Sequence, residues 1–118
     1  MNGPPILQVI FFHNPSGREP VREWLKEMDK EDRIAIGEDI KLVQFRWPLG
    51  MPLVRKLEAD LWEVRSHLND GRIARVFFTV RRTEMVLLHG FIKKSQKTPT
   101  DEMALAQGRK NLWWQGVE

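Results

Sequence analysis

Residues 61–92, LWEVRSHLNDGRIARVFFTVRRTEMVLLHGFI, decide the fold of this chain. They contain three strand-length runs rich in β-branched and aromatic residues, at 61–68, 72–80 and 85–92. The first two runs are separated by Asn69-Asp70-Gly71, and the Asp-Gly step is favoured in tight hairpins. The last two are separated by the short segment from Arg81 to Glu84. Three strands joined by short turns predict an antiparallel meander.

Upstream of the meander, apolar residues recur at helical spacing in two segments. The first segment follows Pro20, which suits the first turn of a helix, and the second ends at Pro48 and Gly50. A polar break at residues 29–32 separates them, so they predict a hairpin of two antiparallel helices. The two apolar stripes are Val21, Trp24, Leu25 and Met28, then Ile36, Ile40, Val43 and Trp47.

The ends of the chain add one strand and one helix. The run from Ile6 to Phe12 predicts a strand that ends at a cluster of turn-forming residues. Thr98-Pro99 predicts the start of a helix that reaches about Trp113. The expected order is β-α-α-β-β-β-α, an α+β fold with a small, antiparallel-rich sheet. At 118 residues we expect a single domain over 1–118, because two halves would each be too small for a sound core.

Composition narrows the class of protein. There is no cysteine, which excludes disulfides and thiolate metal sites and is compatible with a reducing cytoplasm. The apolar run at 6–12 is too short to span a membrane and has no basic leader before it, so we expect a cytoplasmic protein. Residues 61–118 carry 10 Lys and Arg against 6 Asp and Glu, whereas residues 1–60 carry 9 against 10. A basic second half suits a polyanion-binding face, although a solvated surface with a modest basic bias explains it as well.

Side-chain alternation assigns the charged residues to one face of the meander. Glu63, Arg65 and His67 share a face of the first strand, and Arg75 is expected beside them on the second. The apolar row of Ala74, Val76, Phe78 and Val80 then faces the helices. A row of cations suits a phosphate that gains negative charge when a ribose 2′-OH attacks it, without a metal or cofactor. The titratable candidates for acid and base are His67, His89 and Glu63.

Each of these residues also has a structural interpretation. Arg75 and Glu63 can pair across the strands, and His89 lies among apolar residues as a core histidine would. The two tryptophans Trp113 and Trp114 either cap the core or form a contact surface. The lysines after the third strand are equally explained by a solvated loop; they are Lys93, Lys94 and Lys97.

Three motifs taken in order resemble the phage-derived HigB-like branch of the RelE/ParE toxin superfamily. They are Val54-Arg55-Lys56-Leu57 followed by Leu61-Trp62-Glu63-Val64-Arg65, then residues 71–78, then Leu87 to Pro99 with its Leu-His-Gly-Phe-Ile-Lys-Lys start. Ala104 and Arg109 in the last helix also suit the family.

The resemblance implies a RelE-like α+β toxin of a type II toxin–antitoxin system. Such toxins act as mRNA interferases, which are endoribonucleases that cut mRNA on the ribosome by metal-independent 2′-OH attack. A HigA-like helix-turn-helix antitoxin would be the partner. By position, Arg65 and Arg75 match the phosphate-contacting arginines, and Lys93 and Lys94 match a basic pair at the end of the next strand. Arg55, Lys56 and Lys97 would help to bind RNA, and His67 is a geometric candidate for acid or base.

Two departures from the family pattern keep an alternative open. The residue before the second arginine, often aromatic in the family, is Ala74, and the chain has no tyrosine for stacking or acid–base work. The superfamily also contains ParE-like proteins that poison gyrase. The alternatives are therefore a gyrase poison, or a non-catalytic protein-binding module of phage origin.

Overall fold

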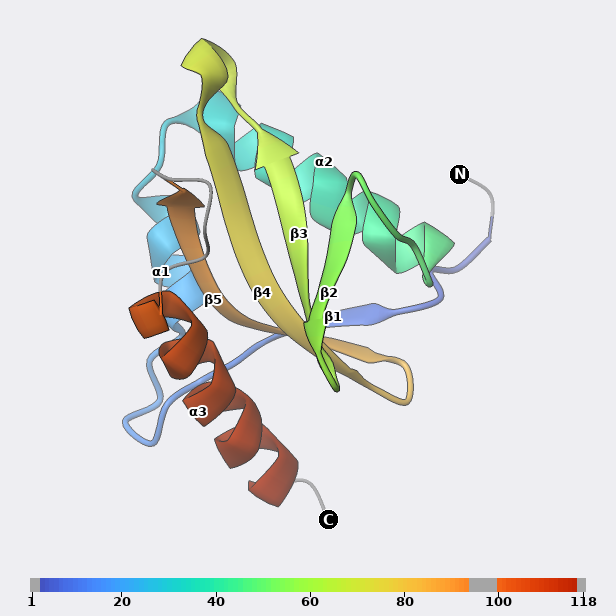
Figure 1. The fold of residues 1–118 in the computed structure, drawn as a ribbon, viewed down its shortest axis with the longest axis vertical. Helices are drawn as coiled ribbons and strands as arrows, with labels where there is room; N and C mark the ends of the chain where they lie inside the picture. The colour runs from blue at the N-terminus through green and yellow to red at the C-terminus, as the bar shows by residue number, and fades with distance from the viewer. Residues whose placement is uncertain (1–2, 94–99, 117–118) are drawn as a thin grey trace.

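In a computed structural model of the protein, one five-stranded sheet carries helices on both faces (Figure 1). The structure describes residues 3–93 and 100–116. The strands are β1 (Gln8–Phe11), β2 (Val54–Glu58), β3 (Leu61–His67), β4 (Ile73–Arg81) and β5 (Glu84–Lys93). The helices are α1 (Pro20–Lys26), α2 (Lys30–Arg46) and α3 (Thr100–Gly116), with a single 3-10 turn, η1, at Asn69–Gly71. The predicted α+β class is confirmed.

The predicted meander forms the centre of the sheet, whose strand order is β1-β5-β4-β3-β2. β3, β4 and β5 pair antiparallel in sequence order, and β1 pairs parallel to β5 at the edge. In the turn between β3 and β4, Asp70 and Gly71 both adopt positive φ, at 66° and 74°. Aspartate and glycine tolerate this backbone region better than most residues, which explains the tight turn at this point.

The strand β2 was missing from the sequence prediction. Val54–Glu58 pairs antiparallel with β3 and forms the second edge of the sheet, so the order is β-α-α-β-β-β-β-α. Its sequence, VRKLE, is short and three-fifths charged, which hides it from a search for apolar runs. Charged side chains are typical of edge strands, because they discourage pairing with another chain.

The helical hairpin also differs from its prediction at one boundary. α2 begins at Lys30, so most of the expected polar break at 29–32 is the first turn of a helix. Acidic residues in that turn favour the positive end of the helix dipole. One of them, Asp32, is buried and accepts hydrogen bonds from both terminal nitrogens of Arg72, at 2.9 and 3.0 Å. The ion pair with Arg72, which lies 40 residues further along the chain, therefore fixes the first turn of α2 at the place where the sequence alone suggested a break.

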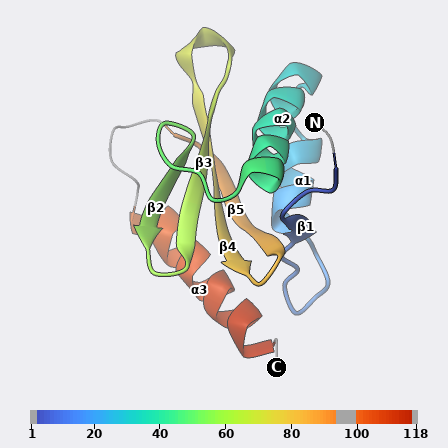
Figure 2. The ribbon, with the colours of Figure 1, turned by 90° about the vertical axis from the view of Figure 1, so that its right-hand side faces the viewer.

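Two apolar cores lie on opposite faces of the sheet. α1 packs on β5 and α2 on β3 over the first face, whereas α3 packs over the second (Figure 2). As predicted, Ala74, Val76 and Phe78 face the helical hairpin. The second core joins Phe12, Leu61, Phe77, Val86, Leu88 and Ala106. Among the described residues, no helix has both the length and the apolar character needed to cross a membrane.

Gly90 in β5 sits under the indole ring of Trp24 from α1. A Cβ atom placed at this glycine would lie 2.4 Å from Trp24 Cζ3 and 2.5 Å from Cε3. Only a residue without a side chain lets the ring approach the strand so closely. The glycine in the Leu-His-Gly-Phe motif is therefore explained by packing of the helical hairpin on the sheet.

Candidate functional site

Four cationic side chains on four adjacent strands form the basic strip of the sheet. They are Arg55 on β2, Arg65 on β3, Arg75 on β4 and Lys93 on β5. The register places them on one face, since Arg55 pairs with Glu63, Arg65 with Arg75, and Lys93 with Ile73. This is the face that carries α3, but α3 packs over its other end, on Leu61 and Phe77 (Figure 1).

The charges of the basic strip are close enough to act on one another. Burial lowers the pKa of Lys93, and the nearby cations Arg75, Arg65 and Arg55 lower it further, while Glu63 opposes them. With the four cations and this single carboxylate ionised, the cluster carries a net charge of +3. Arg65 and Arg75 are directly opposed across two strands, an arrangement that costs stability because like charges face each other. Such a concentration of positive charge is typical of a site for an anion.

Arg75, the buried member of the strip, forms an ion pair with Glu63. Arg75 Nη1 donates a hydrogen bond to Glu63 Oε1 at 2.5 Å, and the two side chains are 3% and 0% exposed. The structural interpretation of these two residues, pairing across β3 and β4, is therefore confirmed. Because the pair is buried, removing either partner leaves an uncompensated charge in the protein interior.

His89 is held by α3 and is a satisfied core histidine. Its Nδ1 lies 3.3 Å from Arg109 Nη1, and its Nε2 lies 3.1 Å from Glu102 Oε1. Arginine can only donate, so Nδ1 accepts and Nε2 carries the proton that is donated to the carboxylate. Burial lowers the pKa of His89 and the Arg109 charge lowers it further, while Glu102 opposes both. The neutral imidazole therefore links β5 to α3 through its contacts with Glu102 and Arg109.

His67 is the exposed histidine at the end of β3. Alternation places it on the same face as Arg65, and its partner on β4 is Ile73, which in turn pairs with Lys93. Arg65 and His67 line a hollow of about 270 Å³ together with Asp39, Pro52 and Leu53. Of the three titratable candidates, His67 alone combines exposure with a position beside the strip, since Glu63 and His89 are engaged in the interior.

The other predicted site residues lie apart from the strip or outside the described residues. Lys56 pairs with Trp62, whose ring packs in the core under the helical hairpin, so Lys56 points to the opposite face from Arg55. Lys94 and Lys97 fall within 94–99, outside the described part of the chain. Sequence reasoning joined Arg55 and Lys56 because β2 had not been recognised as a strand, and the alternation within VRKLE is the signal that separates them.

One aromatic residue of the site was not singled out from the sequence. Phe91 pairs with Arg75 across β4 and β5 and is half-buried on the face of the strip. Its ring stacks on His89 at 5.7 Å and meets Phe77 edge to face at 5.3 Å. The same alternation that placed Arg75 would have placed Phe91 beside it, once the register was known.

The two C-terminal tryptophans cap the core. Trp113 packs against the second core, and Trp114 Nε1 donates a hydrogen bond to Thr79 Oγ1 at 3.0 Å. The guanidinium of Arg81 lies over the Trp114 ring, 5.0 Å from its centroid. Of the two interpretations of these residues, the structure supports the structural one.

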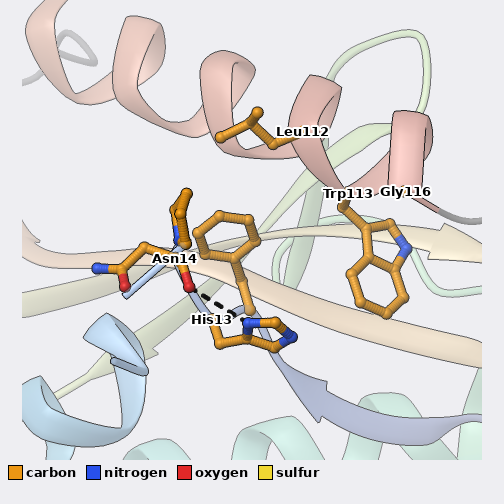
Figure 3. Close-up of a pocket in the computed structure, with 7 residues that line it drawn as sticks. His13, Asn14, Leu112, Trp113 and Gly116 are labelled. Carbon is orange, nitrogen blue, oxygen red and sulfur yellow. Dashed lines mark hydrogen bonds between the residues drawn. The ribbon is translucent and has the colours of Figure 1, made fainter. Parts of the chain in front are cut away.

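A separate hollow of about 290 Å³ lies between the loop after β1 and the last turns of α3 (Figure 3). Its lining is mainly apolar, with Phe12, Leu112 and Trp113 as the large side chains. His13 Nδ1 lies 3.3 Å from the carbonyl oxygen of Asn14 at its rim. No lysine or arginine is among the described residues that line it, so this hollow does not suit a phosphate. The basic strip therefore remains the candidate site for an anion.

Comparison with protein families identifies the chain. Residues 23–111 match the family described as phage derived protein Gp49-like, a range that includes every member of the basic strip. None of the curated proteins compared with the chain matches it. The Gp49-like family is a member of the RelE-like toxin superfamily. With an α+β fold consistent with that superfamily and a matching range covering most of its length, this chain belongs to the phage-derived Gp49-like family.

Proposed function

We propose that the protein is the HigB-like toxin of a type II toxin–antitoxin system and cuts mRNA on the ribosome. The observation that carries the proposal is the basic strip, in which cations from four strands gather at the end of the sheet face away from α3. Arg55 is exposed and Arg65 and Lys93 are half-buried, while Arg75 is buried between them. RNA binding draws most of its affinity from phosphate neutralisation, which such a strip provides. Membership of a RelE-like toxin family supports the same activity.

The proposed reaction is an intramolecular transfer within the RNA. The ribose 2′ oxygen forms a bond to the adjacent phosphorus while the bond from phosphorus to the 5′ oxygen breaks. A base removes the 2′-OH proton, and an acid protonates the departing 5′ oxygen, so the products are a 2′,3′-cyclic phosphate and a 5′-OH. Negative charge builds on the non-bridging oxygens during this step, and fixed cations lower its energy.

The strip offers groups for each part of this reaction. Arg65 and Arg55 would donate hydrogen bonds to phosphate oxygens, and arginine does so with a fixed fork of donors. Lys93, at the end of the neighbouring strand, would add a point charge to the phosphate contact. The exposed imidazole of His67 is the candidate for proton transfer. Lys94 and Lys97 would extend the contact with RNA.

A HigA-like helix-turn-helix antitoxin is the proposed partner in the cytoplasm. Covering the strip or neutralising its charge would silence the toxin. An acidic segment of the antitoxin would do both, and such a complex would weaken at high salt because the attraction is electrostatic.

The decisive experiment compares two arginine variants in a bacterial host under tight induction. Arg65→Ala removes a half-buried cation of the strip, and Arg33→Ala removes an exposed cation from α2 on the other side of the sheet. Arg75→Ala is a poor probe, because it would leave Glu63 buried and unpaired. Primer extension on a translated mRNA reports cleavage, and circular dichroism verifies folding.

We expect growth arrest and discrete, translation-dependent cuts from the wild type and from Arg33→Ala, and loss of both from Arg65→Ala. A folded Arg65→Ala protein that still cuts mRNA would contradict the assignment of the strip as the site. Arrest without cuts would contradict the nuclease and direct attention to gyrase or another protein target.

A further inference from the structure

The ion pair between Arg75 and Glu63 is joined by one hydrogen bond rather than two. Arg75 Nη1 binds Glu63 Oε1, while Arg75 Nε and Glu63 Oε2 are buried and have no hydrogen-bond partner among the described residues. A guanidinium and a carboxylate often align as a fork that makes two parallel bonds. The pair therefore holds a buried donor and a buried acceptor that no described residue satisfies.

A third unused group lies on the neighbouring strand. Arg65 Nε is also buried without a hydrogen-bond partner in the described part of the chain, and Arg65 is directly opposite Arg75 in the register. Buried polar groups without partners are costly and rare, so each one calls for an explanation. One negatively charged group with several acceptor atoms could accept hydrogen bonds from both guanidinium groups. A phosphate has this chemistry.

We infer that Glu63 is a resident counter-anion, which occupies Arg75 until a phosphate of RNA replaces it. This inference rests on the proposed function of the strip. On binding, phosphate oxygens accept hydrogen bonds from Arg75 and Arg65, and Glu63 gives up its bond from Nη1. The charge of Lys93, which already acts on Glu63, then compensates the buried carboxylate. A small isolated anion competes poorly with a carboxylate already in place. An RNA strand competes well, because its neighbouring phosphates are held by Arg55 and Lys93 at the same time. Glu63 thus acts through Arg75 as a specificity-determining residue.

The test measures binding of a fluorescein-labelled oligoribonucleotide, 2′-O-methylated to prevent cleavage, by fluorescence anisotropy at fixed salt. Glu63→Gln keeps an acceptor for Arg75 and removes the competing charge, and we expect it to tighten binding about tenfold. Glu58→Gln is the matched control. Glu58 belongs to β2 and bonds to Gln107 and Lys110 of α3, so we expect a change of about twofold or less. Inorganic phosphate should reduce the RNA affinity of Glu63→Gln at concentrations that leave the affinities of the wild type and the control unchanged, because no carboxylate competes with phosphate for Arg75 in that variant.

A double variant separates exchange at Arg75 from a general change of charge. In Glu63→Gln/Arg75→Met both members of the pair are neutral, and the gain in affinity should disappear because it acts through Arg75. A gain that survives in the double variant, or a Glu63→Gln affinity equal to that of Glu58→Gln, overturns the inference. Failure of all variants to bind RNA overturns it too.

A measurement on the wild type covers the case in which a variant fails to fold. Saturation with the oligoribonucleotide should shift the side-chain Nε–H resonance of Arg75 in the nitrogen NMR spectrum, and an unchanged resonance overturns the inference. Cleavage is read separately by primer extension in cells. Cuts without the gain in affinity refute the role of Glu63 alone, whereas the gain without cuts refutes the nuclease alone.

Discussion

Replacement of Gly90 by alanine should destabilise the protein while leaving every charge of the basic strip in place. The added Cβ would lie 2.4 Å from Trp24 Cζ3, 2.5 Å from Cε3 and 2.9 Å from Cη2. Carbon atoms pack at roughly 3.5–4.0 Å, so the indole ring must retreat by about 1 Å or β5 must bend. Both responses disturb the contact of α1 with β5, which fixes the helical hairpin on the sheet.

The size of this effect follows from overpacking in a close-packed interior. Extra methyl groups in such places cost about 1–3 kcal/mol of unfolding free energy. Because the three contacting atoms belong to a rigid ring, we expect Gly90→Ala near the middle of that range, about 2 kcal/mol. For a domain of this length the midpoint of thermal unfolding should fall by roughly 5–12 °C.

Urea denaturation followed by circular dichroism gives the free energy directly. Gly108→Ala is the matched control, because open space surrounds that glycine in α3 and alanine favours a helix by about 0.5–1 kcal/mol. Trp24→Leu in the Gly90→Ala background should recover part of the loss, since the smaller side chain makes room for the methyl group. The reasoning is refuted if Gly90→Ala unfolds at the urea concentration of the wild type, or if its cost is unchanged when Trp24 is absent.

Three further outcomes can be measured with the same unfolding assay. Arg75→Ala should lower the free energy of unfolding by about 3–5 kcal/mol, because it leaves Glu63 buried and unpaired. The double variant Glu63→Leu/Arg75→Met removes both charges and should be close to neutral in stability. Equal losses of stability in the two proteins would contradict the buried-pair argument. The pKa of His89 is lowered in the folded protein from its ordinary value of 6.5. When the pH falls below 6.5, the unfolded chain therefore binds a proton at His89 before the folded protein does. Unfolding free energy should therefore fall between pH 7 and the lowered folded pKa, and His89→Gln should flatten that fall; an unchanged slope would count against this role. Trp114→Phe should lower the free energy of unfolding by about 1 kcal/mol, because the hydrogen bond to Thr79 is lost. An unchanged free energy of unfolding would show that this bond does not contribute to stability.

The meander and the helices were predictable because their signals are local. Asp70-Gly71 marks a turn wherever the flanking runs are apolar, and alternation along the strands placed Arg75 on the same face as Arg65. The strand β2 was not predictable in this way, because its pairing with β3 is a property of the sheet edge rather than of its own residues. The start of α2 was hidden for a similar reason, since Asp32 is explained by Arg72 in a distant turn.

The sequence predicted which residues of the candidate site lie together, but not how deeply they are buried. The sequence placed Glu63 and Arg75 together, yet alternation says only which face a side chain occupies and not whether that face is covered there. Burial of the pair depends on how β2, β5 and their side chains assemble around it. The separation of Lys56 from Arg55 and the placement of Phe91 beside Arg75 likewise required the register of neighbouring strands.

The parallel pairing of β1 with β5 has a consequence for the order of folding. Gln8 is opposite Glu84, so the first strand to be synthesised has to wait for the last one before it can join the sheet. Contacts between such distant parts of a chain form slowly, because a long loop must close first. The basic strip also requires Lys93, at the far end of β5. The four cations therefore come together only after Lys93 has been synthesised and β5 has paired with β4, and a shorter growing chain carries an incomplete strip.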